Sequence, residues 1–287
     1  MWMCENLRPI LEKGCEMFDT KLAQKAADNL RRVREKKPLI HNITNYVVMN
    51  YTANALLACG ASPVMAHAAE EVEEMVSFAG ALVLNIGTLT PRWVEAMLRA
   101  GKRANAVNVP IILDPVGSGA TRLRTESAKR LTRELSMAVV RGNASEVLSL
   151  AKKEARTKGV DSVHSVDEAE GAALALATDL KTTLAITGKV DLITDGKRIL
   201  RVHNGHEMMS RVTGTGCTAT VIIGAFLAVD PDAVHAAATA LAYFGLSGEK
   251  AASQVNAPGS YQMALLDALF TIDEEELLAG ATIEVVR

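Results

Sequence analysis

ALVLNIGTLTPRWVEAMLRAGKRANAVNVPIILDP, residues 81–115, contains two short apolar runs with a longer helical pattern between them. The runs at 81–87 and 109–115 have the length and the β-branched content of buried strands. The pattern at 92–108 is long enough for a helix that crosses from one strand to the next. This stretch therefore predicts two parallel strands joined by a helix.

The same alternation continues through most of the chain. Further strands are predicted at 38–42, 62–66, 137–143, 182–188 and 190–194, and further helices at 49–60 and 70–80. Residues 186–205 predict an antiparallel hairpin at a sheet edge, with its turn at Asp195 and Gly196. From Thr215 to about Leu278 the pattern is mostly helical. Together these segments predict an α/β fold with a mainly parallel central sheet flanked by helices.

The domain organisation follows from the absence of a linker in the sequence. No stretch rich in Gly, Ser or Pro divides the chain, so we expect one domain over residues 21–287 and an N-terminal extension over residues 1–20. Charged residues in the extension interrupt any signal-peptide core and favour an amphipathic helix. The most polar stretch, 152–170, predicts a surface loop and a helix.

Composition and charge narrow the class of protein. Of the 287 residues, 49% are hydrophobic, which predicts a sizeable core. The net charge of −2 argues against a nucleic-acid partner, which would require a basic surface. The longest apolar run, 218–229, is too short to cross a membrane. Four scattered cysteines without a C-x-x-C pair indicate a reduced, cytoplasmic protein.

Small and polar residues follow several predicted strands. In an open parallel sheet, ligands collect beyond the carboxyl ends of the strands. Each glycine taken alone is also explained by a tight turn. Five such segments together nevertheless predict one binding rim: 85–88, 114–121, 141–146, 186–188 and 213–217.

Asp114 and Glu146 are the candidate metal ligands. A carboxylate at a strand end and another one turn into a helix can hold Mg²⁺ directly or through its waters. The alternative is structural, because Asn143 and Glu146 have the spacing of a helix N-cap and its capping box. Both roles are compatible with each other.

Arg141 and Thr187 are candidate nucleotide contacts. The planar guanidinium of Arg141 suits a phosphate, although a solvated arginine would also fit this position. Thr187 precedes Gly188 at a strand end, where its hydroxyl could complete the strand or contact a nucleotide. Met65, at the end of a predicted strand, is by composition more typical of a core.

Cys217 follows the glycine turn Gly214-Thr215-Gly216 and begins an apolar helical pattern. The start of a helix presents unpaired N–H groups and attracts anions, so Cys217 is either a small core residue or part of a phosphate site. GTGCTA at 214–219 also fits a dinucleotide fingerprint. The polar stretch before it makes that interpretation weak, because the fingerprint requires a preceding hydrophobic strand.

With these motifs in view, the chain from about Pro38 onward resembles the hydroxyethylthiazole kinase family of ribokinase-like enzymes. The matching segments occur in the same order along the chain, at 41–68, 79–89, 112–127, 141–146, 158–162, 185–196, 203–217 and 257–269. The resemblance implies a single-domain, three-layer ribokinase-like fold. It also implies ATP- and Mg²⁺-dependent phosphorylation of the hydroxyl of 4-methyl-5-(2-hydroxyethyl)thiazole in thiamine salvage, by a homotrimer with active sites at subunit contacts.

The resemblance assigns roles residue by residue. Met65, Asn45 and Gly214 are expected to contact the thiazole. Arg141 and Thr187 would then contact ATP, and Asp114 and Glu146 would organise magnesium. The Gly214-Thr215-Gly216 turn would hold the migrating phosphoryl group on its N–H donors.

Cys217 would stand where many ribokinase-like kinases have an aspartate base. A helix N-terminus is expected to lower the pKa of this thiol and bound ATP to raise it, which predicts a weak base. The alternative function is another ribokinase-like activity, such as a hydroxymethylpyrimidine kinase or an ATP-dependent hydrate dehydratase. Those enzymes usually keep the aspartate, so Cys217 counts against them. A non-catalytic binding module and a nicotinamide oxidoreductase are the remaining alternatives.

Overall fold

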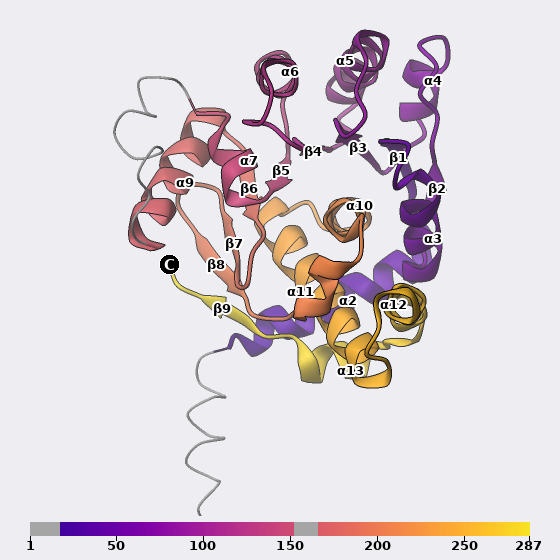
Figure 1. Cartoon of the computed structure of the whole chain (residues 1–287), viewed down its shortest axis with the longest axis vertical. Helices are drawn as coiled ribbons and strands as arrows, with labels where there is room; N and C mark the ends of the chain where they lie inside the picture. The colour runs from indigo at the N-terminus through magenta and orange to yellow at the C-terminus, as the bar shows by residue number, and fades with distance from the viewer. Residues whose placement is uncertain (1–17, 152–165) are drawn as a thin grey trace, which may run out of the picture.

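The computed structural model describes residues 18–151 and 166–287 (Figure 1). Residues 1–17 of the predicted extension and 152–165 of the predicted polar loop lie outside the described residues, as does the family motif at 158–162. The boundary between residues 20 and 21 therefore stays a prediction, although the first described helix, α2, begins close to it at Thr20.

The described residues form one nine-stranded sheet in the order β2-β1-β3-β4-β5-β6-β7-β8-β9. The strands are β1 (Leu39–Ile43), β2 (Ser62–Val64), β3 (Ala81–Asn85), β4 (Ile111–Asp114), β5 (Val139–Gly142), β6 (Thr183–Ile186), β7 (Asp191–Thr194), β8 (Ile199–Val202) and β9 (Ile283–Val285). Strands β1 to β6 are parallel to one another, and β7, β8 and β9 each pair antiparallel with the strand before them. This confirms the predicted mainly parallel α/β sheet.

The predicted edge hairpin is present, but it does not form the edge. β7 and β8 pair as expected around Asp195 and Gly196, and β9 then covers β8 through Ile283 and Val202. A three-residue strand at the end of a mostly helical segment is too short to show a period in the sequence. The strand predicted at 62–66 also ends early, at Val64, so Met65 lies in the following loop.

Helices cover both faces of the sheet (Figure 1). One face carries α2 (Thr20–Lys36), α3 (Met49–Cys59), α10 (Thr215–Leu227), α11 (Ala233–Gln254), α12 (Pro258–Thr271) and α13 (Glu274–Gly280). The other carries α4 (Val72–Val76), α5 (Pro91–Ala106), α6 (Arg122–Glu134), α7 (Ala144–Leu148) and α9 (Val166–Leu180). No helix of the described residues is long and apolar enough to cross a membrane.

Two apolar cores form because successive strand residues face opposite sides. In β3, Val83 packs into the core with α10, whereas Leu82 and Leu84 pack into the core with α5. Every residue of β3, β4, β5 and β6 is buried, which explains why these strands were read as continuous apolar runs.

Helix α10 is the element that brings the site together. All of its residues from Thr218 to Leu227 are buried, and Gly224 lets the helix lie close to the sheet because a Cβ there would meet Val83 at 3.0 Å. The hydroxyl of Thr220 donates to Asp114 at the carboxyl end of β4. The N-terminus of α10 therefore opens onto the rim formed by the strand ends.

Candidate active site

A hydrogen-bonded network joins the ends of β1, β3 and β4. Asp114 is 1% exposed, and its Oδ2 accepts from Asn85 Nδ2 at 3.0 Å and from Thr220 Oγ1 at 2.8 Å. Asn85 Oδ1 accepts from Asn45 Nδ2 at 2.9 Å, and Asn45 Nδ2 also lies 3.7 Å from Cys217 Sγ. The network thus links the predicted metal ligand Asp114 to the predicted thiazole contact Asn45 and to Cys217.

Arg141 extends the same network toward β6. Its Nη1 lies 3.7 Å from Asp114 Oδ2, and its Nη2 donates to Thr187 Oγ1 at 2.5 Å. The guanidinium also lies against the glycine turn, because a Cβ on Gly216 would meet Arg141 Nη1 at 2.7 Å. Within the described residues, Arg141 Nε is buried without a hydrogen-bond partner, which is unusual for so strong a donor.

The start of α10 has the properties of an anion site. Its N-cap, Gly214, has a φ of +88°, a conformation that favours glycine, and no side chain among the described residues caps the helix. The Thr215 hydroxyl points back and donates to the carbonyl of Met209. The first N–H groups of the helix therefore remain available beside a guanidinium, as a phosphate requires.

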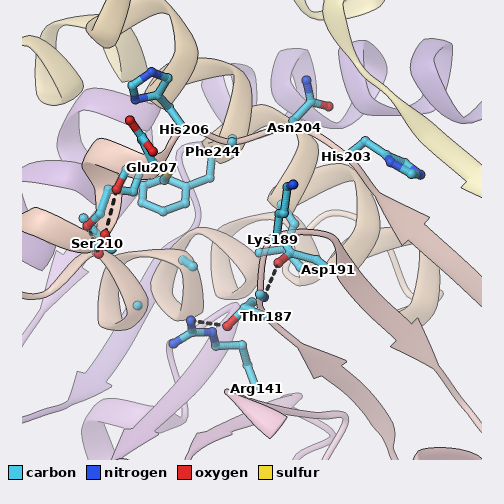
Figure 2. Close-up of a pocket in the computed structure, with 18 residues that line it drawn as sticks. Arg141, Thr187, Lys189, Asp191, His203, Asn204, His206, Glu207, Ser210 and Phe244 are labelled. Atoms are coloured by element: carbon cyan, nitrogen blue, oxygen red, sulfur yellow. Dashed lines mark hydrogen bonds between the residues drawn. The ribbon is translucent and has the colours of Figure 1, made fainter. Parts of the chain in front are cut away.

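A cavity of about 790 Å³ adjoins this anion site (Figure 2). Figure 2 shows Arg141 and Thr187 at one end of it and His206 and Glu207 at the other. The predicted residues that line it are Arg141, Thr187, Thr215 and Gly216. Phe244, Leu241 and Ala219 supply apolar wall. The volume and the lining suit a nucleotide whose phosphates lie at the Arg141 end.

Burial raises the pKa of Asp114 from 3.8 to about 6. The charge of Arg141 and the hydrogen bond from Thr220 oppose this rise, and the charge of Glu146 adds to it. The carboxyl is therefore ionised at neutral pH but poorly compensated, and a cation close to it and Glu146 would be favoured.

The predicted lowering of the Cys217 pKa by the helix N-terminus is wrong. Burial, followed by the charge of Asp114, raises the pKa of Cys217 to about 11, despite the opposing effects of Asn85, Arg141 and Asn45. Desolvation outweighs the helix dipole because the half-buried thiol lies next to Asn45 and close to the buried carboxylate of Asp114. The thiol is consequently protonated at neutral pH.

Glu146 caps its helix as expected. Asn143 Oδ1 accepts from the Glu146 N–H at 2.9 Å, and Glu146 Oε2 accepts from the Asn143 N–H at 3.0 Å. Glu146 Oε1 also accepts from the Gly117 N–H at 2.8 Å, which ties the loop after β4 to α7. The described residues contain no group of three or more His, Cys, Asp or Glu side chains that could enclose a metal.

Met65 lies just beyond the end of the short strand β2. It is half-buried in the loop after β2, where its carbonyl accepts from His67 Nδ1 at 3.2 Å and the neighbouring Ala66 carbonyl accepts from His41 Nε2 at 2.7 Å. Neither of these two hydrogen bonds joins Met65 to Asn45 or Cys217. Gly214, the other predicted thiazole contact, packs against Val48, which a Cβ would meet at 2.7 Å.

Sequence reasoning missed Asn85, Thr220 and Asp191. The segment 85–88 was recognised as a strand end, so a polar residue on the rim was the available signal for Asn85. Burial raises the pKa of Asp191 on the cavity wall to about 6, against the opposing Gly188 N–H and Arg141 charge. The glycine turn is preceded by a short 3₁₀ helix, η1 (Glu207–Arg211), which confirms that GTGCTA is no dinucleotide fingerprint.

The fold is that of the ribokinase-like proteins. The structure is similar to a ribokinase-like superfamily protein from Enterococcus faecalis, with a TM-score of 0.62 at 13% identity over 89% of this chain and 95% of that one. It is also similar in fold to pyridoxal kinase from Staphylococcus aureus solved with ADP, with a TM-score of 0.56 at 18% identity over 75% and 88% of the two chains.

The model of the hydroxyethylthiazole kinase family matches residues 30–275, and the chain belongs to this family. It is 60% identical over 90% of its length to hydroxyethylthiazole kinase from Desulfotalea psychrophila, covering 95% of that protein. The hydroxyethylthiazole kinase structure from Pyrococcus horikoshii OT3 superposes with a TM-score of 0.84 at 44% identity, over 91% of this chain and 99% of that one. The chain is therefore a phosphotransferase whose co-substrate is ATP, as the resemblance predicted.

Proposed function

We propose that this kinase transfers the γ-phosphoryl group of ATP to the hydroxyl of 4-methyl-5-(2-hydroxyethyl)thiazole, a step of thiamine salvage in the cytoplasm. The observation that carries the proposal is the continuous network from Asn45 and Cys217, through Asn85 and Asp114, to Arg141 and the nucleotide cavity. This network supports the proposal because direct transfer between two bound substrates requires an acceptor side and a phosphate side next to each other.

On the phosphate side, Arg141 and Thr187 bind ATP. The guanidinium is held by Thr187 and Asp114 and lies against Gly216, so it faces the same space as the N–H groups of the Gly214-Thr215-Gly216 turn. Planar donors and free helix N–H groups together neutralise the charge that spreads over the transferred phosphoryl oxygens. Most of the rate in phosphoryl transfer comes from such positioning and charge stabilisation.

Asp114 and Glu146 would hold Mg²⁺ at this side of the site. Two observations support the fit of these residues to Mg²⁺. The negative charge of Glu146 acts on Asp114, so a cation near both would be favoured. The hydrogen bonds that Asp114 accepts from Asn85 and Thr220 both go to Oδ2, which leaves Oδ1 for the ion. Mg²⁺ usually keeps several waters and takes only one or two carboxylates, so a larger protein cluster is not required. The ion would supply charge neutralisation of the phosphates.

On the acceptor side, Met65, Asn45 and Gly214 bind the thiazole. The acceptor oxygen forms its bond to phosphorus as the bond from the γ-phosphorus to the oxygen of the β-phosphate breaks, so that ADP leaves. The hydroxyl proton passes to the small thiolate fraction of Cys217 or to solvent. Because the pKa of Cys217 is about 11, thiolate is scarce at neutral pH and general-base help is small. Cys217 therefore acts as a weak proton acceptor whose main role is to contact the hydroxyl beside Asn45.

The enzyme acts as a homotrimer with its sites at subunit contacts. Tyr46 and Val47 follow Asn45 directly and are 65% and 64% exposed. Large apolar side chains exposed next to a site favour a protein contact there.

The experiment that tests the proposal incubates the full chain with ATP, Mg²⁺ and a panel of thiazole and pyrimidine alcohols, followed by mass analysis of the products. The expected result is phosphorylation of the hydroxyethylthiazole with little turnover of hydroxymethylpyrimidine. Equal or greater turnover of the pyrimidine would replace the proposed substrate and leave a kinase with the alternative specificity.

A further inference from the structure

We infer that Asn85 is a positioning residue for phosphoryl transfer, because one carboxamide holds the acceptor-side residue Asn45 and the phosphate-side residue Asp114 in a fixed relation. This inference rests on the proposed function of the site. Asn85 is the last residue of β3 and is 2% exposed. In the sheet it pairs directly with Asp114, the last residue of β4. The Asn85 side chain therefore contacts both Asn45, on the acceptor side, and Asp114, on the phosphate side.

The oxygen of Asn85 fixes the acceptor side. Oδ1 accepts from Asn45 Nδ2 at 2.9 Å and from the Gly87 N–H at 3.0 Å. Gly87 in turn packs against Asn45, because a Cβ on Gly87 would lie 2.5 Å from it. The Asn45 Oδ1 accepts from the Val47 N–H at 3.0 Å. Both ends of the Asn45 carboxamide are thus held, and its Nδ2 points toward Cys217.

The nitrogen of Asn85 fixes the phosphate side. Nδ2 donates to Asp114 Oδ2 at 3.0 Å, where Thr220 donates as well. The carboxylate accepts only, so the Asn85 amide has a single orientation in which both of its ends are satisfied. Aspartate at position 85 would keep the oxygen for Asn45, but it would replace the amide donor with a second carboxyl group beside Asp114, and the two carboxyl groups would share a proton. Serine is too short to keep both contacts.

A second buried asparagine of this chain also donates to a buried aspartate, without a site beside it. Unlike Asn85 Oδ1, its Oδ1 has no hydrogen-bond partner among the described residues. Asn29 Nδ2 donates to Asp230 Oδ2 at 3.0 Å and contacts Thr239 Oγ1 at 3.1 Å, in a fully buried position on α2. Asp230 lies beyond the C-terminal end of α10, about 20 Å along that helix from the glycine turn. Asn29 is therefore a matched control for the structural part of the Asn85 contacts.

The test compares Asn85→Ser, Asn85→Asp and Asn29→Ser in the full chain. Melting temperature, kcat, and KM for ATP and for the thiazole alcohol are measured, with the Kd of the alcohol from calorimetry as a readout independent of turnover. For Asn85→Ser we expect kcat to fall about 10- to 100-fold and KM for the alcohol to rise about 5- to 20-fold. KM for ATP should stay within about twofold, since Arg141 and Thr187 keep their contacts.

For Asn85→Asp we expect the same loss in kcat with the alcohol KM and Kd within about threefold of wild type, because only the Asp114 side is lost. The double variant Asn45→Ala/Asn85→Ser should have an alcohol Kd only a little higher than that of Asn85→Ser, because Asn45 and Asn85 act as a unit. Asn29→Ser should lower the melting temperature and leave kcat and both KM values unchanged.

The inference is overturned if Asn85→Ser lowers kcat no more than Asn29→Ser, or if Asn85→Asp weakens alcohol binding as much as Asn85→Ser does. Should Asn85→Ser not fold, Asn85→Asp alone decides between these outcomes, because it keeps the shape of the side chain. If wild type phosphorylates a different alcohol, the proposed function fails, and the same variants are compared with that alcohol.

Discussion

The buried carboxyl group of Asp114 belongs to the candidate site and lowers the stability of the folded protein at neutral pH. Its pKa rises from 3.8 to about 6 on folding, so the folded protein holds this proton more tightly than the unfolded chain does. The contribution of Asp114 to stability is therefore highest below pH 3.8, falls as the pH rises from 3.8 to about 6, and stays lower above it. A shift of this size corresponds to at most ~3 kcal/mol at neutral pH.

Asp114→Asn removes the buried charge. The variant should melt about 5 °C or more above wild type at pH 7.5, and this difference should vanish near pH 3.5. Its turnover should fall at least ~100-fold, because the carboxylate beside the phosphates is gone. Calorimetry and kinetics across pH provide the measurement. Asp230→Asn is the control: Asp230 is 2% exposed and pairs with Lys25 at 3.0 Å, so removing its charge should lower the melting temperature.

For Cys217, the sequence and the structure give opposite directions for the pKa shift of the thiol. With a pKa of about 11, the thiol contributes little as a base, so Cys217→Ala should lower turnover by about tenfold or less. Cys217→Asp should remain active, because a carboxylate accepts a proton readily and the start of α10 partly offsets its charge. Turnover and melting temperature are measured for both variants. A folded but inactive Asp variant would contradict the proposed role of Cys217.

Glu146 combines a structural and a proposed catalytic role in one side chain. Glu146→Gln keeps an oxygen for the Asn143 or Gly117 N–H, so the melting temperature should change by only about 1–3 °C. Turnover should fall by about tenfold or more, since a carboxylate near the phosphates is lost. The assay is run across magnesium concentrations. Equal turnover of the two proteins at limiting magnesium would leave Glu146 with its capping role alone.

At the scale of elements, the site depends on the close approach of α10 to β5. Gly216 leaves room for the Arg141 guanidinium, and a methyl group there would lie 2.7 Å from Nη1. Gly216→Ala should therefore displace Arg141 and raise KM for ATP about tenfold, the loss expected for one charge-assisted contact. Alanine is the better helix former, so the melting temperature should stay near that of wild type.

Kinetics with varied ATP, beside a melting curve, measure this effect. Gly224→Ala serves as the control on the same helix, because its Cβ would meet Val83 in the core at 3.0 Å and should lower stability without a specific change in KM for ATP. An unchanged KM in a folded Gly216→Ala variant would mean that Arg141 does not bind the nucleotide.

At the scale of the whole molecule, the proposed trimer places its contacts next to Asn45. Val47→Glu puts a charge on an exposed apolar residue beside the site, so we expect smaller species in sedimentation velocity and lower turnover together. Phe78→Glu is the control: this side chain is 70% exposed and precedes the start of β3, whereas the site lies at the other end of that strand. A monomeric wild type would exclude sites shared between subunits.

The sequence by itself determined the local elements and the class of fold. The apolar runs predicted eight of the strands because buried parallel strands are short and continuously apolar, and the helical patterns between them predicted the layers. The same segments end in the small and polar residues that form the rim, so Asp114, Arg141, Thr187 and the glycine turn were found without a structure. These signals are local, and local spacing is what a sequence records.

Only the tertiary structure decided how those residues act on one another. The pairing of β9 with β8, the network through Asn85, and the burial that raises the pKa of Cys217 all depend on segments far apart in the chain. A pKa reflects the solvent and charge around a group, and both arise from packing. The helix start alone predicted a lowered pKa for the thiol. Enclosure by the ends of β1, β3 and β4 reversed that direction, because desolvation of a charge outweighs a partial helix dipole.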